Sequence, residues 1–199
     1  PSIEFSGQQP TGGDAGEDGK PPRVFARDKL GHGLTLGFAL TVPFGLRTEW
    51  EDDWAGRYHA IDSDLNVTQG TLSVAKSVGG GLSLAGGLVI QQLDVELTNA
   101  IETPTTDGFS RIDADSHGYG WLVGALWQGK DTRIGVSYHS AVVHDIRGTQ
   151  HREIPTFPGT FPASLRATSG SRDFRATARL ELPARAIAGI RHRLTSDWR

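Results

Sequence analysis

The chain of 199 residues carries 20 basic and 23 acidic residues, and its formal net charge of −3 excludes the strongly basic surface typical of nucleic-acid binding. It contains no cysteine, which excludes disulfides, thiolate metal sites and a cysteine nucleophile. No apolar run of about 18 residues is present, so a transmembrane helix is excluded, whereas transmembrane strands need only about 9–11 alternating residues.

The start of the chain has little regular pattern. It begins at Pro1 with neither a methionine nor a signal sequence, and we therefore expect an internal section of a longer protein. The first clear element is a strand at residues 33–42, where leucine, phenylalanine and valine alternate with glycine, threonine and alanine.

An interruption follows this strand and is formed by Pro43, Phe44 and Gly45. Proline removes a donor from the hydrogen-bond ladder, and glycine tolerates backbone geometries that other residues avoid, so strand pairing should fail locally. Two interpretations stay open. Either the strand ends here at a loop, or it kinks within a continuous wall.

Further strands follow at residues 71–78, from residue 82 onward and at 119–127, and two more are expected at 174–182 and 184–194. Tyr119 and Trp127 lie at opposite ends of one strand face, about 26 Å apart at ~3.3 Å per residue. This separation matches the height of the outward apolar band of a membrane barrel, roughly 25 Å. We expect these two aromatic side chains to mark the two membrane interfaces.

The segment 132–147 is predicted to be one long strand with an apolar and a polar face. The apolar face would contain Ile134, Val136, Tyr138, Val142 and Ile146. The polar face would contain Arg133, Ser137, His139, Asp145 and Arg147. A polar inner face beside an apolar outer face is typical of a water-filled barrel, although a soluble β-sandwich shows the same alternation.

Loop lengths favour the membrane barrel. The predicted connections at 79–81 and 129–131 are tight turns, and those that alternate with them, at 46–64, 99–116 and 149–172, are long. Outer-membrane barrels have short periplasmic turns and long external loops, whereas a sandwich has no reason to sort its loops in this way.

The sequence offers no catalytic or metal-binding pattern. His144 and His151 are predicted to lie on a strand and in a loop, without metal-ligand spacing. The segment Ser169-Gly170-Ser171 lacks the pattern that surrounds a serine nucleophile, and the glycines at 79–81 precede a strand instead of a helix. We therefore predict that the protein is not an enzyme and has neither a cofactor nor a metal.

Several segments together resemble the FadL family (OMPP1/FadL/TodX), outer-membrane transporters of long-chain fatty acids and related hydrophobic compounds. The matching segments include Gly33-Leu34-Thr35-Leu36-Gly37, Pro43-Phe44-Gly45-Leu46, Trp54-Ala55-Gly56-Arg57-Tyr58, Gly118-Tyr119-Gly120-Trp121, Arg133-Ile134-Gly135-Val136-Ser137-Tyr138-His139-Ser140 and Leu182-Pro183. The resemblance implies an all-β fold, an antiparallel transmembrane barrel of fourteen strands with an internal hatch. Residues 1–199 would then form one partial barrel domain of about seven strands, without the hatch and first strand at its start and without the last strands at its end.

The resemblance also implies a function in the outer membrane of a Gram-negative bacterium. The protein would passively transport long-chain fatty acids, or aromatic or aliphatic hydrocarbons, and its strand kink at Pro43, Phe44 and Gly45 would release cargo sideways into the membrane. The following loop would be anchored at the interface by Trp50, Trp54 and Tyr58. We expect a monomeric barrel in contact with outer-membrane lipid and lipopolysaccharide, and no nucleic-acid partner.

Cargo capture in this family occurs between two external loops, here 99–116 and 149–172. The residues suited to this role are Ile154, Phe157, Phe161 and Leu165 in the second loop and Phe109 in the first. A carboxylate cargo also requires a cation inside the barrel, for which the candidates are Arg111, Arg147 and Arg175.

Two other functions remain open at the level of sequence. The protein could be an outer-membrane barrel that acts as an adhesin or structural protein, with loops that bind a partner instead of cargo. It could also be a soluble β-sandwich or a lipocalin-like carrier. Dependence on detergent distinguishes either barrel from the soluble carrier.

Overall fold

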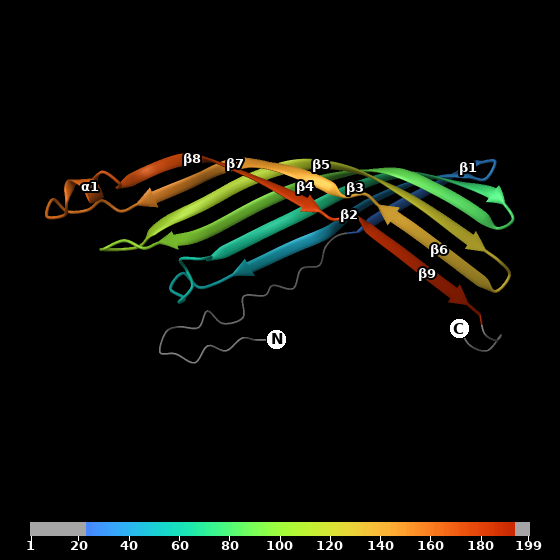
Figure 1. The fold of residues 1–199 in the computed structure, drawn as a ribbon, viewed down its shortest axis with the longest axis horizontal. Coiled ribbons are helices and arrows are strands. Elements are labelled where there is room, and N and C mark those ends of the chain that lie inside the picture. The colour runs from blue at the N-terminus through green and yellow to red at the C-terminus, as the bar shows by residue number, and fades with distance from the viewer. Residues whose placement is uncertain (1–22, 194–199) are drawn as a thin grey trace.

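The structure, a computed structural model, describes residues 23–193 and is dominated by one antiparallel sheet of nine strands (Figure 1). The elements are β1 Val24–Gly31, β2 Leu34–Glu49, β3 Asp62–Gly79, β4 Leu82–Ile101, β5 Gly108–Gln128, β6 Thr132–His139, β7 Val142–Ile154, α1 Ala163–Arg166, β8 Gly170–Leu182 and β9 Arg185–His192. Within these residues no helix is long and apolar enough to cross a membrane.

The nine strands occupy seven positions in the sheet. β6 and β7 both pair with β5 and follow one another along it, and β9 and β8 pair with β6 and β7 in the same way. Each of these two positions is therefore one long strand with a short break, at residues 140–141 and 183–184. This arrangement confirms the predicted all-β, antiparallel section of about seven strands.

Turns and loops lie at opposite ends of the sheet (Figure 1). The turns at residues 32–33, 80–81 and 129–131 join strands at one end, and the loops 50–61, 102–107 and 155–169 join them at the other. The predicted sorting is thus correct, but the loops are shorter than predicted because the strands continue further toward them. Gly79, Gly80 and Gly81 all have positive φ values, which explains why the turn between β3 and β4 consists of glycine.

The sheet is curved, and its two faces differ in exposure. The concave face, called the inner face below, contains the most buried side chains, among them Val67, Leu93 and His144. The convex outer face carries large exposed apolar side chains, including Leu88 (66% exposed) and Tyr119 (70% exposed). An apolar surface of this kind, directed away from the concave side, is what a barrel wall presents to lipid.

β2 does not end at Pro43, as one interpretation of the sequence proposed. It continues to Glu49, and its register with β3 shifts by one residue between the pairs Thr41↔Gln69 and Phe44↔Val67. This is a β-bulge, because one extra residue of β2 lies between the two pairs. The extra residue also reverses the faces, so that even-numbered residues of β2 point outward before the bulge and inward after it.

A second reversal lies at the break between β6 and β7. Ser140 replaces part of the ladder there, since its backbone N–H donates to the Trp121 carbonyl at 2.9 Å and its Oγ accepts from the Trp121 N–H at 2.9 Å. Tyr138 points outward, in the same row as Val123, whereas Val142 is buried on the inner face. The predicted single alternation over residues 132–147 is therefore wrong.

Gly118 on the inner face of β5 makes room for this break. A Cβ atom at this position would lie 2.4 Å from Val142 Cγ1 and 2.8 Å from His144 Cε1. Both neighbours are buried on the inner face, so neither can move away cheaply. The glycine is thus a packing requirement of the wall.

Replacing Gly118 with alanine should destabilise the folded barrel by about 1–3 kcal/mol through overpacking. The measurement is the denaturant midpoint of the full-length parent protein refolded in detergent. Gly70→Ala is the matched control, because a Cβ at Gly70 meets no atom within 4 Å. Equal midpoints for the two variants would contradict this interpretation.

Candidate functional site

The inner face just beyond the β2 bulge is largely apolar, and most of its polar and charged side chains lie in the rows next to the loops. One register row crosses six strand positions on this face, and it consists of Leu46, Leu65, Val95, Ala114, Gly148 and Ala176. Leu46 is 52% exposed, and Phe44 and Phe174 on the same face are 45% and 44% exposed. A water-filled barrel normally has a polar interior, so an exposed apolar lining indicates a different use of this space.

The neighbouring row, on the outer face at the same height, is charged or polar at every position. It consists of Arg47, Asp64, Glu96, Asp113, Thr149 and Arg175. Near the loops the usual polarity of a membrane barrel is therefore inverted, with charge outside and apolar side chains inside. This part of the wall extends beyond the apolar outer band of Leu88 and Tyr119.

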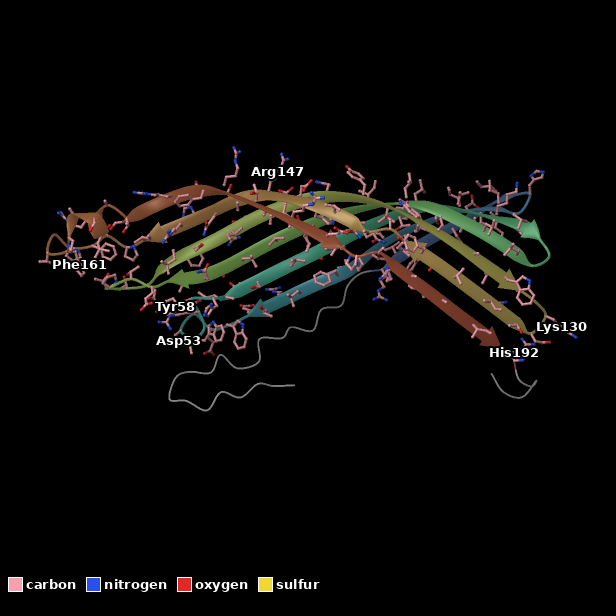
Figure 2. The ribbon with its side chains drawn as sticks, viewed as in Figure 1. Asp53, Tyr58, Lys130, Arg147, Phe161 and His192 are labelled. Atoms are coloured by element: carbon pink, nitrogen blue, oxygen red, sulfur yellow. The ribbon has the colours of Figure 1, made fainter. Side chains whose placement is uncertain are left out.

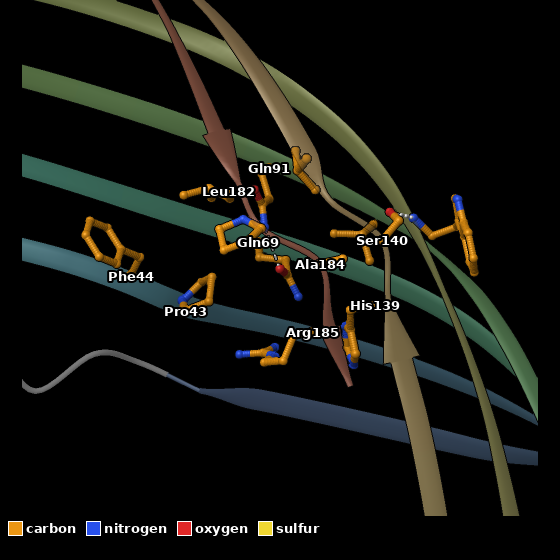
Figure 3. A pocket seen from close by; sticks show the side chains of 13 residues that line it. Pro43, Phe44, Gln69, Gln91, His139, Ser140, Leu182, Ala184 and Arg185 are labelled. Carbon is orange, nitrogen blue, oxygen red and sulfur yellow. Dashed lines mark hydrogen bonds between the residues drawn. The ribbon is translucent and has the colours of Figure 1, made fainter. Parts of the chain in front are cut away.

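A cavity of ≈ 300 Å³ lies on the inner face next to the β2 bulge (Figure 3). Pro43 and Phe44 line it from β2, and His139 and Arg185 line it from the breaks in the other two strand positions. Its floor includes Gln91. The β2 bulge, the break between β6 and β7 and the break between β8 and β9 thus border the same cavity.

A chain of hydrogen bonds crosses this region of the inner face. The buried His144 Nε2 lies 3.1 Å from Gln91 Oε1, and Gln91 Nε2 donates to Gln69 Oε1 at 2.8 Å. Gln69 Nε2 in turn donates to Thr71 Oγ1 at 3.1 Å. These bonds satisfy amide groups that would otherwise be costly to bury.

Pro43 lies at the bulge of β2. Pairing of β1 with β2 stops at Val24↔Leu40, so beyond Leu40 the described residues pair β2 only with β3. Gly45 does not have a positive φ, and a Cβ at this position would meet no atom within 4 Å. The irregularity therefore depends on the extra residue and on Pro43, which lacks an N–H, and not on the glycine.

The structure places the predicted capture residues in different parts of the wall and its loops. Phe157 in the loop 155–169 is buried and packs against Phe161, with ring centroids 5.6 Å apart. Leu165 lies in α1 of the same loop, and Ile154 ends β7 on the inner face. Phe109 is not in a loop, because it belongs to β5 and pairs with Ala100 and Glu153 on the outer face.

The three arginines predicted to lie inside the barrel are on the outer face. Arg147 points away from the convex side of the sheet (Figure 2). Arg175 belongs to the outer charged row, and Arg111 forms ion pairs with Glu96 at 2.9 Å and Asp113 at 3.0 Å. The face reversal after residue 140 explains the difference for Arg147, because a single alternation over residues 132–147 predicts the wrong face beyond the break.

Two other arginines face inward near the loops, and no sequence pattern distinguishes them. Arg152 and Arg172 are directly opposite one another on β7 and β8. Arg152 Nε is buried and has no hydrogen-bond partner, and Arg172 donates to the Ala167 carbonyl at 2.8 Å. Two like charges in opposite positions repel one another, so this pair favours a bound anion.

The loop 50–61 is compact and tied to the loop beside it. Trp50 and Trp54 stack with centroids 4.3 Å apart, and Arg57 forms an ion pair with Asp107 at 2.8 Å. Tyr58 Oη donates to the same carboxylate at 3.1 Å. The hydrogen bond from Arg57, followed by that from Tyr58, lowers the pKa of Asp107 from its ordinary value.

The packing of the loop 50–61 bears on the expectation that its aromatic residues lie at the membrane interface. Tyr119 and Trp127 lie on the outer face at opposite ends of the apolar band. Trp50 directly follows β2. The end of β2 lies on the loop side of the charged row, about 26 Å along the strands from the row that contains Tyr119. Trp50 and Trp54 thus pack on one another in the loop, and their role at a membrane interface stays a prediction.

His151 lies on β7, not in a loop as predicted. Its Nδ1 is 2.7 Å from Asp173 Oδ1, and its Nε2 is 3.2 Å from Ser171 Oγ. The order of these contacts resembles that in serine hydrolases, but the side chains of His151 and Asp173 are 45% and 68% exposed on the outer face. We interpret the contacts as a cross-strand network that joins β7 to β8. Among the described residues no cluster of acidic and histidine side chains could hold a metal.

The fold and this site define a section of an outer-membrane β-barrel with an apolar inner lining. Residues 2–199 match the family model described as outer membrane protein transport protein (OMPP1/FadL/TodX), and the chain belongs to this family. The family consists of transport proteins and not of enzymes, and the protein is located in the outer membrane of a Gram-negative bacterium.

Three known proteins illustrate the similarity. The 47 kDa outer membrane protein of Pasteurella multocida is 25% identical over 194 residues, which cover 89% of this chain and 45% of the relative. The long-chain fatty acid transport protein of Escherichia coli is 28% identical over 137 residues, which cover 56% of this chain and 30% of the relative. The crystal structure of a Pseudomonas aeruginosa FadL homologue matches with a TM-score of 0.75 and 22% identity, over 93% of this chain and 48% of that one. This chain thus spans less than half the length of each of them.

The tether between Arg57 and Asp107 should persist in mild acid. Because the folded-state pKa of Asp107 is lowered, its stabilising contribution is present above the ordinary aspartate range and is lost only as the pH falls through the lower folded value. A spin label on Ala55→Cys in the parent protein should therefore keep a constant mobility from neutral pH through that range, and become more mobile below it.

Asp107→Asn should make the same label mobile at every pH. Glu102→Gln is the matched control, since Glu102 lies in the same loop but forms no ion pair in the described structure. A mobile label already at neutral pH in the unmodified loop would contradict the tether.

Proposed function

We propose that this chain is the central wall of a passive transporter that carries long-chain fatty acids, or other hydrophobic compounds such as hydrocarbons, across the outer membrane. The observation that carries the proposal is the apolar inner lining, which runs from the loop end to the β2 bulge through Phe174, Leu46 and Phe44. The name of the Escherichia coli relative, a long-chain fatty acid transport protein, supports the same cargo.

The proposed route begins at the external loops. Phe161, which packs on the buried Phe157, and Leu165 are partly exposed in the loop 155–169, where cargo would first leave water. Each Å² of apolar surface removed from water contributes about 25 cal/mol, so a long acyl chain gains several kcal/mol by moving onto such a surface. The cargo would then follow the inner lining toward the membrane without an input of energy other than partitioning.

The bulge at Pro43 would be the exit. A gap in a barrel wall exposes unpaired backbone groups to lipid, which is tolerated where the gap lines a cavity. Pro43 reduces this cost because it has no N–H to leave unpaired, and with Phe44 it borders the inner cavity. These features support lateral release of hydrophobic cargo from the lumen into the membrane.

The carboxylate of a fatty acid would be held by Arg152 and Arg172. These guanidinium groups face inward below the capture loop, and Gln150, which donates to Ser110 Oγ at 2.9 Å, lies beside them. An anion between them would relieve their mutual repulsion and could bond to the free Arg152 Nε. This pair replaces Arg111, Arg147 and Arg175 as our candidate for the cargo carboxylate.

Removing the bulge should block release. Deleting Val42 and replacing Pro43 with threonine restores a regular ladder, while Thr41 and Phe44 keep their present faces. We expect cells that express this variant of the full-length parent to take up long-chain fatty acid several-fold more slowly than cells with the unmodified protein, at equal surface expression.

Gly45→Ala is the control for this experiment, because the added methyl group enters open space and the bulge remains. It should transport normally. Unchanged uptake after repair of the bulge would rule out lateral release at Pro43. If the unmodified parent transports neither fatty acid nor hydrocarbon, the adhesin or structural role becomes the better explanation of the barrel.

The arginine pair predicts a dependence on the head group of the cargo. Arg152→Gln and Arg172→Gln should weaken uptake of a long-chain fatty acid several-fold and leave uptake of an alkane of equal length nearly unchanged. Arg191→Gln is the control, since Arg191 also faces an arginine, Arg133, but near the turn end of the sheet. Equal losses for acid and alkane would show that the pair acts on the fold and not on the carboxylate.

A further inference from the structure

The outer face beyond the apolar band carries an acidic hollow and, beside it, a group of three arginines. On β3, β4 and β5 this surface forms a shallow hollow lined by carboxylates, which are Asp64, Asp94, Glu96, Asp113 and Asp115. On β7 and β8 it carries three exposed arginines, Arg147, Arg175 and Arg179, called the outer arginine group below. The same face of β7 and β8 also carries the carboxylates Asp145, Glu153, Asp173 and Glu181, so the arginines stand among acidic residues.

The register of β7 and β8 brings the outer arginine group together. Arg147 is opposite Thr177, which lies between Arg175 and Arg179 on β8. Arg147 is therefore a diagonal neighbour of both, at about 7–8 Å between Cα atoms. Long arginine side chains span such a distance, so three guanidinium groups can reach one anion.

The three guanidinium groups are available for an external ligand. Asp115 is opposite Arg147 and Asp145 is opposite Arg179, but neither forms an ion pair with its arginine within 4.0 Å in the described structure. Glu181, two residues from Arg179, is likewise exposed, and Asp173, two residues from Arg175, contacts His151 at 2.7 Å. These carboxylates moderate the positive charge of the group without occupying its donors.

The height of the group on the wall indicates the ligand. Val143 and Tyr138 are outer-face apolar residues of β7 and β6, and Asp145 and Arg147 are the next outward positions toward the loops. At about 3.3 Å per residue, Arg147 and Arg179 lie roughly 7–13 Å beyond the last apolar side chain. In an outer membrane this level, on the loop side, is that of the phosphorylated head groups of the external leaflet.

We propose that the outer arginine group binds the phosphate groups of lipopolysaccharide. Guanidinium groups bind phosphate oxygens in a bidentate manner, and these three point away from the lumen, where cargo cannot reach them. The adjacent acidic hollow repels phosphate, so the lipid is held on the β7–β8 side of the wall. This inference shares with the proposed function only the assignment of the loop end to the cell exterior.

The test compares the lipopolysaccharide that remains bound to the full-length parent after purification in detergent, measured by mass spectrometry per barrel. The triple variant Arg147→Gln/Arg175→Gln/Arg179→Gln should retain several-fold less than the unmodified protein. The control triple variant Arg133→Gln/Arg185→Gln/Arg191→Gln removes the same charge from the inner face and should retain the normal amount. The single variants, each with one exposed substitution, answer the question if the triple variant fails to assemble.

Two further arms identify the ligand. Dephosphorylated lipopolysaccharide should rebind to the unmodified protein as weakly as intact lipopolysaccharide rebinds to the triple variant. Inorganic phosphate at equal concentration should not displace the lipid.

Equal retention by the two triple variants overturns the proposal, as does displacement by free phosphate. A third outcome also overturns the proposal: the unmodified protein is an oligomer, and the triple variant is a monomer that keeps its lipid. The arginines would then contact the acidic hollow of a second copy. Fatty-acid uptake is measured separately, so the two proposals can fail independently.

Discussion

The structure depends on the period-two alternation of its strands, which decides which side chains face lipid and which face the lumen. Near the turns this protein needs apolar residues outside, and near the loops it needs them inside. β3, β4 and β5 achieve the inversion by a change of residue type along an unbroken strand, from Leu88 outside to Val95 inside. The other long positions use an extra residue or a break to exchange their faces, at Pro43, Ser140 and Pro183.

This difference explains where an interpretation of the sequence succeeds. The regular strands could be placed from alternation alone, and Tyr119 and Trp127 were correctly expected at opposite ends of one outer face. The separation of turns from loops follows from the same pattern. Local sequence is sufficient for these features because each depends on residues within one strand and its turn. The number of strand positions does not follow from this pattern, because β1 has no clear pattern and the segments 174–182 and 184–194, expected as two strands, share one position.

The site could be predicted only in part, because it depends on register between strands. The break at Ser140 shifted Arg147 to the opposite face, and the early start of β5 turned Phe109 from a loop residue into an outer-face residue. Arg152 and Arg172 have ordinary sequence surroundings, and only the pairing of β7 with β8 shows that they confront one another. Loop aromatics were assigned to the membrane because their composition is suitable, but Trp50 and Trp54 pack on each other.

The tight glycine turns also have a consequence for assembly. Gly79, Gly80 and Gly81 join β3 to β4 with almost no intervening loop, so the entropy lost in closing this hairpin is small and its contacts are local in sequence. The hairpin should therefore form early and extend by zipping toward the loop end. The longer connections, with their charged outer rows, would then be ordered last, and these are the parts that must be carried through the bilayer. Slow translocation of the loop ends, and not strand pairing, should accordingly limit the rate at which this wall is built.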